Sequence, residues 1–225
     1  MTDSRLPSLS PLEARVLGVL IEKQVTTPDY YPLTVNALVA GCNQKSNRDP
    51  VMNASEAEVQ MALDALKRQT LVIDSYGASG RVMRYAHNLP KVLDIGQAAT
   101  ALLAALMLRG AQTPGELRTG SERLYRFADI SSVEAYLEEM SARAAGALVT
   151  KLPKQPGSRE HRWAHLLSDA VPIESVTAAA PPEPAGSVTT GEIAALKSNV
   201  AELRDQVAEL RAMVEQLYKD LGTAR

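Results

Sequence analysis

Near the ends of two successive stretches, the chain carries almost the same six-residue phrase. The first reads Arg84-Tyr85-Ala86-His87-Asn88-Leu89, and the second reads Arg162-Trp163-Ala164-His165-Leu166-Leu167, 78 positions later. A repeat at this spacing indicates two copies of one structural unit, since each copy ends on the same local sequence. The duplication therefore limits the fold to a small module that occurs twice.

Helix and turn signals divide the first copy into three helices and a hairpin. Ser10-Pro11-Leu12-Glu13 predicts a capped helix start, and Tyr31-Pro32 predicts the start of a second, short helix. Ser55 and Glu58 have the capping-box spacing of a third helix. Apolar strands on both sides of a Gly-Ala-Ser-Gly turn at 77–80 then predict a β-hairpin.

The second copy shows the same order of signals. The apolar run from Gln97 to Leu108 predicts its first helix. A capping box at Thr113-Pro114-Gly115-Glu116 opens a helix that we expect to reach Phe127, and Ser131 with Glu134 predicts the cap of the third helix. A second hairpin closes the copy on the repeated phrase.

The two copies can be aligned through their Thr-Pro pairs. Aligning Thr27-Pro28 with Thr113-Pro114 gives an offset of 86 against 78 at the repeated phrase, which assigns eight extra residues to the polar loop at 42–53 of the first copy. Three helices followed by a two-stranded wing are typical of the winged-helix variant of the helix-turn-helix. The sequence thus predicts a mainly α fold with small β wings, arranged as two tandem winged-helix domains at residues 1–90 and 91–168.

Three long motifs carry a resemblance to a known family. They are Thr26-Thr27-Pro28-Asp29-Tyr30-Tyr31-Pro32-Leu33-Thr34, Cys42-Asn43-Gln44-Lys45-Ser46-Asn47-Arg48-Asp49-Pro50 and Arg109-Gly110-Ala111-Gln112-Thr113-Pro114-Gly115-Glu116-Leu117-Arg118. Through them, residues 8 to 168 resemble the YceH-like family of uncharacterised bacterial proteins. The resemblance implies a tandem pair of winged-helix domains in a bacterial cytoplasmic protein, and it brings no activity, cofactor or site residues with it.

Composition and charge argue against several classes of protein. Residues 1–5 lead into Pro7 without the charged and then apolar pattern of a signal peptide. The longest apolar run, Ala98 to Leu108, is shorter than the roughly 20 residues that span a bilayer. A single cysteine, Cys42, fits a reducing compartment. We therefore expect a cytoplasmic protein with no membrane partner, and its net charge of −2 lacks the basic excess typical of nucleic-acid binders.

The C-terminal part of the chain has a different composition. Residues 169–190 contain four prolines and no Lys or Arg, which indicates a linker. Within residues 191–222, apolar side chains recur at alternating spacings of three and four, the heptad pattern of a coiled coil. The heptad residues are Ile193, Leu196, Val200, Leu203, Val207, Leu210, Val214, Leu217 and Leu221.

These heptads also predict how the chain pairs with itself. Mostly β-branched a positions and Leu at every d position favour two parallel strands. The basic e positions Lys197, Arg204 and Arg211 would face one another in an antiparallel homodimer, whereas a parallel one separates them. We expect a parallel homodimer; the alternative is that this helix folds back on its own domains.

Signals for catalysis are sparse. His87 and His165 hold equivalent positions in the repeat, which favours a shared structural role over chemistry. On a strand, His161 and His165 would lie about 13 Å apart, too far to bind one metal ion directly. The chain has no phosphate-binding glycine pattern and no nucleophile motif. We expect no enzyme activity, no catalytic or metal-binding residues and no cofactor.

The winged-helix prediction raises the question of DNA binding, which commonly uses polar and basic side chains on the third helix. In the first copy the outward positions are Glu56, Gln60 and Asp64, and in the second they include Glu134 and Glu138. Carboxylates repel phosphates, so neither helix is typical of a base reader.

Basic and polar residues on the wings, the polar loop and the second helix of the second copy form the remaining candidate surface, although they also fit ordinary solvated charges. The candidates for contact with nucleic acid or a partner are Asn43, Gln44, Lys45, Asn47, Arg48, Arg81, Arg84, Arg118, Arg123, Lys154 and Arg159. Two functions follow. One is a dimeric DNA-binding or transcription-regulatory protein with double-stranded DNA as its partner. The other is a dimeric protein-interaction scaffold whose winged helices bind an unidentified protein and no nucleic acid.

Overall fold

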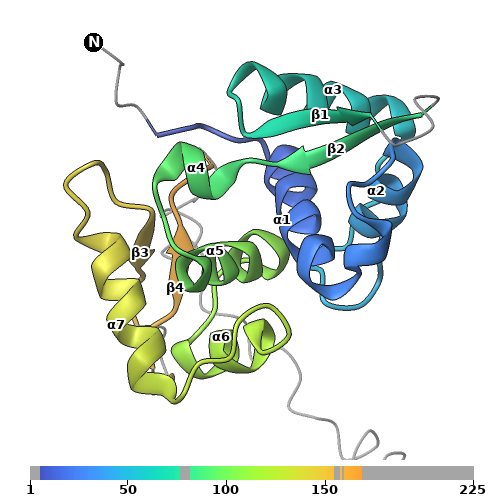
Figure 1. Ribbon diagram of the computed structural model, residues 1–225. Helices are drawn as coiled ribbons and strands as arrows, with labels where there is room; N and C mark the ends of the chain where they lie inside the picture. The colour runs from blue at the N-terminus through green and yellow to red at the C-terminus, as the bar shows by residue number, and fades with distance from the viewer. Residues whose placement is uncertain (1–5, 77–81, 155–157, 159, 169–225) are drawn as a thin grey trace, which may run out of the picture. The chain divides into compact units, whose positions relative to one another are not determined.

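Two successive groups of elements have the same order, three α-helices followed by a pair of antiparallel strands (Figure 1). The structure is a computed structural model that describes residues 6–76, 82–154, 158 and 160–168. The first group comprises α1 (Pro11–Thr26), the 3-10 helix η1 (Pro28–Tyr30), α2 (Val35–Cys42), α3 (Glu56–Arg68), β1 (Val72–Tyr76) and β2 (Met83–His87). The second comprises α5 (Gln97–Arg109), α6 (Pro114–Ser121), α7 (Ile130–Ser141), β3 (Val149–Lys151) and β4 (Trp163–His165), and α4 (Leu89–Leu93) joins the two groups. The described residues thus form a mainly helical fold with two small strand pairs, the mixture typical of winged-helix proteins.

Capping boxes begin most of the long helices. Those at the starts of α1, α3 and α6 are formed as the sequence predicts, with Ser10, Ser55 and Thr113 as N-caps. The predicted cap of α7 is wrong by two residues. Asp129 is the N-cap, its extended backbone allows its carboxylate to accept from the backbone N–H of Ser132 at 2.7 Å, and Ser131 lies inside the first turn.

The second helix of the first copy starts later than predicted, and that of the second copy ends earlier. In the first copy, α2 starts after Thr34, whose hydroxyl accepts from the backbone N–H of Ala37, so the segment around Pro32 precedes the helix. In the second copy, α6 ends at Ser121, six residues before Phe127. Two of the eight residues of α6 are glycines, which weaken a helix by about 1 kcal/mol each relative to alanine.

The strand registers establish which residues of the two copies are equivalent. His87 pairs with Val72, and His165 pairs with Val149 in the same way. Tyr85 also bridges to Leu33, just before the N-cap Thr34, while Trp163 bridges to Gln112, just before the N-cap Thr113.

The equivalent of Thr113 is therefore Thr34, 79 positions earlier, and the alignment through Thr27 is wrong. Connections differ in several places instead of at one loop. The first copy has longer segments before and after its second helix, at 27–34 and 43–55, whereas the second copy has the longer segment between its third helix and wing, at 142–148.

One apolar core runs through both copies, and α1 packs against α5 at its centre (Figure 1). Every residue of α1 from Ala14 to Ile21 is buried, and so is every residue of α5 from Ala98 to Leu108. A Cβ atom at Gly18 would lie 2.9 Å from Cγ of Leu108, so glycine allows the two helices to approach closely. The described residues belong to one compact unit.

Several predictions of domain organisation stay predictions. The proposed boundary after residue 90 falls within α4. The linker at 169–190 and the heptad residues of 191–222 lie outside the described residues. In the described part of the chain, no helix has both the length and the apolar character needed to cross a membrane.

Candidate functional site

The polar loop of the first copy is fastened to α1 by two buried arginines. Arg15 is 1% exposed, and its guanidinium donates to the carbonyl oxygens of Cys42 at 3.1 Å and Pro50 at 2.6 Å, on the two sides of the loop. The side chain of Arg48 is fully buried, donates to the carbonyl of Gly41 at 3.0 Å and pairs with both carboxylate oxygens of Glu22 at 3.2 and 2.6 Å. These contacts hold the loop in one shape.

The charges in this cluster affect one another. Burial alone would raise the pKa of Glu22, but the hydrogen bonds and positive charge of Arg48 outweigh it, and the pKa of Glu22 is lowered. Burial lowers the pKa of Arg15, and the like charge of Arg48 lowers it further. Arg48 therefore serves Glu22 and the loop backbone, and it is not available as an exposed contact residue.

Other residues of the loop also bond within the protein. The side-chain amide of Asn43 donates to the carbonyl of Ala54 at 2.8 Å and accepts from the N–H of the same residue at 2.7 Å. Asn47 has a φ of 58°, in the left-handed region that asparagine tolerates well. The N–H of Asp49 donates to the carbonyl of Leu108 at 2.9 Å, which attaches the loop to the end of α5.

The other predicted contact residues lie in different places. Arg84 donates to the carbonyls of Tyr30 and Pro32, so it fastens η1 to the wing, and the exposed Arg118 reaches the carbonyl of Ala128 at 3.4 Å. Gln44 bonds locally to Ser46. Lys45, Asn47, Arg123 and Lys154 are exposed as well. Two candidates, Arg81 and Arg159, lie outside the described residues.

The third helices expose acids and apolar side chains. On α3, Glu56 and Asp64 are exposed, as predicted, and Met61 between them is 64% exposed. On α7, Glu134 and Glu138 are exposed. Gln60, the polar residue that most resembles a base-reading side chain, accepts from the Tyr85 hydroxyl at 3.3 Å and donates to Asp64. The outward faces thus carry little that would attract a phosphate backbone.

The two equivalent histidines are packed into the fold. Nε2 of His87 lies 2.7 Å from Oε1 of Gln24, and its backbone N–H donates to the hydroxyl of Tyr31 at 2.8 Å. Burial lowers the pKa of His87 and of His165 to about 4, so both rings are neutral at pH 7. Burial also raises the pKa of the Cys42 thiol to about 11. Within the described ranges, no three residues among His, Cys, Asp and Glu gather in a way that would hold a metal ion.

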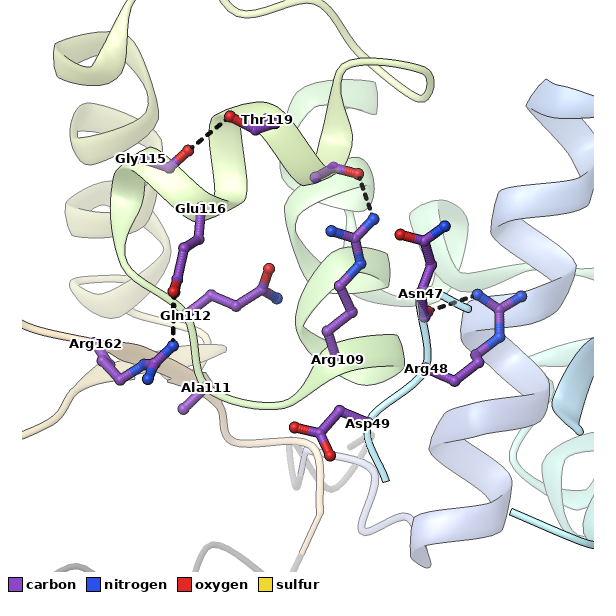
Figure 2. A pocket seen from close by; sticks show the side chains of 11 residues that line it. Asn47, Arg48, Asp49, Arg109, Ala111, Gln112, Gly115, Glu116, Thr119 and Arg162 are labelled. Carbon is purple, nitrogen blue, oxygen red and sulfur yellow. Dashed lines mark hydrogen bonds and ion pairs between the residues drawn. The ribbon is translucent and has the colours of Figure 1, made fainter. Parts of the chain in front are cut away.

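An open groove lies where the polar loop of the first copy meets α6 of the second (Figure 2). Its volume is about 740 Å³. The lining residues are Asn47, Arg48, Asp49, Arg109, Ala111, Gln112, Gly115, Glu116, Thr119, Gly120 and Arg162. Two of the three motifs that carry the family resemblance, 42–50 and 109–118, therefore form one surface.

Polar contacts shape the walls of this groove. Arg162 donates to both carboxylate oxygens of Glu116, at 2.7 and 2.9 Å, and Arg109 donates to the carbonyl of Gly120 at 3.2 Å (Figure 2). Sequence reasoning selected only Asn47 and Arg48 from this set. It missed the others because they come from separate segments, although the motifs that contain most of them were the strongest signal in the chain.

The comparisons with known proteins agree with those motifs. Residues 9–158 match a family model described as "Protein of unknown function, DUF480". A UPF0502 protein of Burkholderia orbicola is 53% identical over 221 residues, which cover 98% of this chain and 92% of the relative. A UPF0502 protein of Leptothrix cholodnii is 50% identical over 215 residues, covering 95% and 96%. Another from Dechloromonas aromatica is 58% identical over 176 residues, covering 78% and 82%.

Proposed function

The chain belongs to the DUF480 family of bacterial proteins, which confirms the YceH-like resemblance of its motifs. From this premise we propose that it is a dimeric protein-interaction scaffold, in which two tandem winged-helix modules bind a partner protein and a C-terminal parallel coiled coil joins two chains. It works in the cytoplasm, without catalysing a reaction and without a cofactor.

This proposal rests mainly on the observation that two of the predicted contact arginines form hydrogen bonds within the protein. A winged helix that binds DNA needs exposed cations near the backbone phosphates. Here Arg48 and Arg84 are occupied with carbonyl oxygens and a carboxylate inside the protein. The exposed faces of α3 and α7 present carboxylates instead, with Met61 and Ile130 as exposed apolar side chains.

Such faces suit a partner protein with basic and apolar side chains. Complementary charge speeds and orients association, while a few exposed apolar side chains contribute the buried contacts of an interface. The acids Asp64 and Glu134 lie on these faces, one in each copy. A dimer doubles the number of such surfaces and raises the avidity for a repeated or dimeric partner.

A site-specific crosslinking experiment tests the proposal. A photo-crosslinking amino acid is placed at Asp64 or Glu134 of the full chain in its bacterial host, and at the exposed Lys154 as a matched control. We expect a discrete protein adduct from the two acidic positions and none from Lys154, and reversal of charge at Glu56 should weaken the adduct formed from Asp64.

If the protein binds DNA, the DNA-binding regulator predicted from the sequence would be favoured over the scaffold. In a gel shift with fragmented genomic DNA at about 50 and 200 mM salt, we expect no retardation at either concentration. A salt-sensitive shift that charge reversal at Lys45, Arg123 and Lys154 abolishes would contradict the scaffold.

Sedimentation of the full chain and of a chain ending at residue 190 tests the dimer, because only the full chain should have twice the monomer mass.

A further inference from the structure

The side chain of Gln112 is held in one orientation within the groove. It is 5% exposed, and its Nε2 donates to the carbonyls of Ala105 at 3.0 Å and Gly110 at 3.4 Å. Because both partners are acceptors, the amide nitrogen has to face them and Oε1 has to point away. Among the residues that the structure describes, no donor reaches Oε1. This largely buried side chain thus presents a preset acceptor to the groove, and no described donor uses it.

Arg109 presents a cation to the same place. The other two arginines of the groove, Arg48 and Arg162, are paired with glutamates, whereas no described acid lies within ion-pair distance of Arg109. Among the described residues, its side chain has one hydrogen-bond partner, the carbonyl of Gly120. The groove therefore holds one arginine whose charge is not compensated locally.

Gly120 leaves room for the guanidinium of Arg109. A Cβ atom on Gly120 would lie 2.6 Å from Nη1 of Arg109 and 3.5 Å from Oε1 of Gln112. The end of the Arg109 side chain is flexible, so a methyl group would displace the guanidinium and leave the fold intact. The guanidinium of Arg109 and Oε1 of Gln112 thus both lie within 3.5 Å of the position that a Cβ atom of residue 120 would take.

The polar groups select a ligand by its donors and acceptors. Arg109 needs an acceptor, preferably an anion, whereas Gln112 Oε1 and the exposed carboxylate of Asp49 need donors. A phosphate backbone offers only acceptors and would meet Asp49. An extended peptide offers N–H and C=O groups in alternation, and a groove of about 740 Å³ has the size of typical ligand clefts.

We propose that this groove binds an extended peptide segment bearing a carboxylate, which pairs with Arg109 while a neighbouring peptide N–H donates to Oε1 of Gln112. The carboxylate is either an acidic side chain or the C-terminus of a chain. This inference rests on the proposed function, since the peptide is a segment of the partner protein, and it names a second surface of the scaffold beside the acidic faces of α3 and α7.

Titration of the ¹⁵N-labelled full chain with three capped peptides tests the chemistry. Acetyl-Gly-Gly-Asp-Gly-amide carries an acidic side chain, acetyl-Gly-Gly-Gly-Gly a free C-terminus, and acetyl-Gly-Gly-Gly-Gly-amide neither. We expect saturable shifts of the Gln112 side-chain amide and the Arg109 Nε–H resonances with one of the first two, which identifies the source, and at least tenfold weaker binding of the third. If none of them produces a saturable shift, or if a DNA duplex produces the larger one, the inference is overturned.

Two glycines provide a pair of variants, one lining the groove and one outside it. Gly120→Ala should weaken binding of the favoured peptide at least tenfold, whereas Gly96→Ala should leave it unchanged, because Gly96 does not line the groove and a Cβ there meets nothing within 4 Å. Neither glycine has a positive φ, so a difference between the two variants reports on the groove. Arg109→Gln should abolish the preference for a carboxylate and does so independently of how Gly120→Ala folds.

Equal losses in the two glycine variants would contradict the inference. Crosslinks at Asp64 and Glu134 distinguish this failure from that of the scaffold. If these crosslinks form but no peptide binds, only the peptide-binding role of the groove is rejected. If the crosslinks do not form, the proposed scaffold function is rejected.

Discussion

The two copies share a scaffold but stabilise their connections by different means. Thr34 and Thr113 cap the second helices, and the histidines His87 and His165 occupy the same register on the wings. In the first copy, a long polar loop is held by a buried ion pair, while in the second the pair between Glu116 and Arg162 is exposed. The two copies thus share the caps of their second helices and the register of their wings, and they differ in the connections, which is where the groove lies.

Removing the arginine of each ion pair should give the largest contrast. Arg48→Met leaves the half-buried Glu22 and the carbonyl of Gly41 without their donor, so we expect a loss of about 3–5 kcal/mol in the free energy of unfolding. Arg162→Met breaks a solvent-exposed pair and should cost less than about 1 kcal/mol. Urea unfolding at pH 7 measures both losses. Equal losses would mean that the buried ion pair of the first copy contributes no more to stability than the exposed pair of the second.

The histidines should make stability depend on pH in both copies. In the unfolded chain each ring binds a proton near pH 6.5, whereas in the folded protein it does so only near pH 4. Between these values the unfolded state holds more protons, so stability falls as the pH falls from 6.5 towards 4. At pH 5 each histidine should cost about 2 kcal/mol relative to pH 7.

His87→Gln and His165→Gln separate the two contributions. Each variant should lose its own share of the pH dependence in denaturant unfolding at pH 7 and pH 5, and the double variant should lose most of it. His87 has Gln24 as a partner, so a smaller effect there than at His165 would indicate that this bond also tolerates the charged ring. Unchanged pH slopes in both variants would show that the rings are solvated.

The smallest contrast concerns the caps of the third helices. Ser55→Ala and Asp129→Ala each remove an N-cap acceptor and should cost about 1 kcal/mol. Ser131→Ala, at the cap predicted from the sequence, should change stability by less than about 0.5 kcal/mol. Thermal unfolding monitored by circular dichroism distinguishes the two serines, and a larger loss at Ser131 than at Asp129 would restore the sequence-based cap.

Local features of the fold could be predicted because they depend on neighbours in the chain. The caps Ser10, Ser55 and Thr113 act on residues three positions away, and the acids of α3 follow from helical spacing. Where two local signals competed, prediction failed. Asp129 and Ser131 are both good N-caps, and two Thr-Pro pairs suggested an alignment that the bridge between Leu33 and Tyr85 excludes.

The amino-acid sequence by itself determined a mainly helical fold with small strand pairs, and it identified the family to which the motifs belong. Only the tertiary structure decided what the polar residues do. From the sequence, Arg48 is predicted to be an exposed cation. In the structure it is buried and paired with Glu22, which lies 26 positions earlier in the chain. Likewise, the groove exists only because the end of the loop packs on α5, which brings Asp49 to Arg109 and Gln112. Burial and long-range pairing depend on the packing of distant segments, and no spacing along the chain encodes that directly.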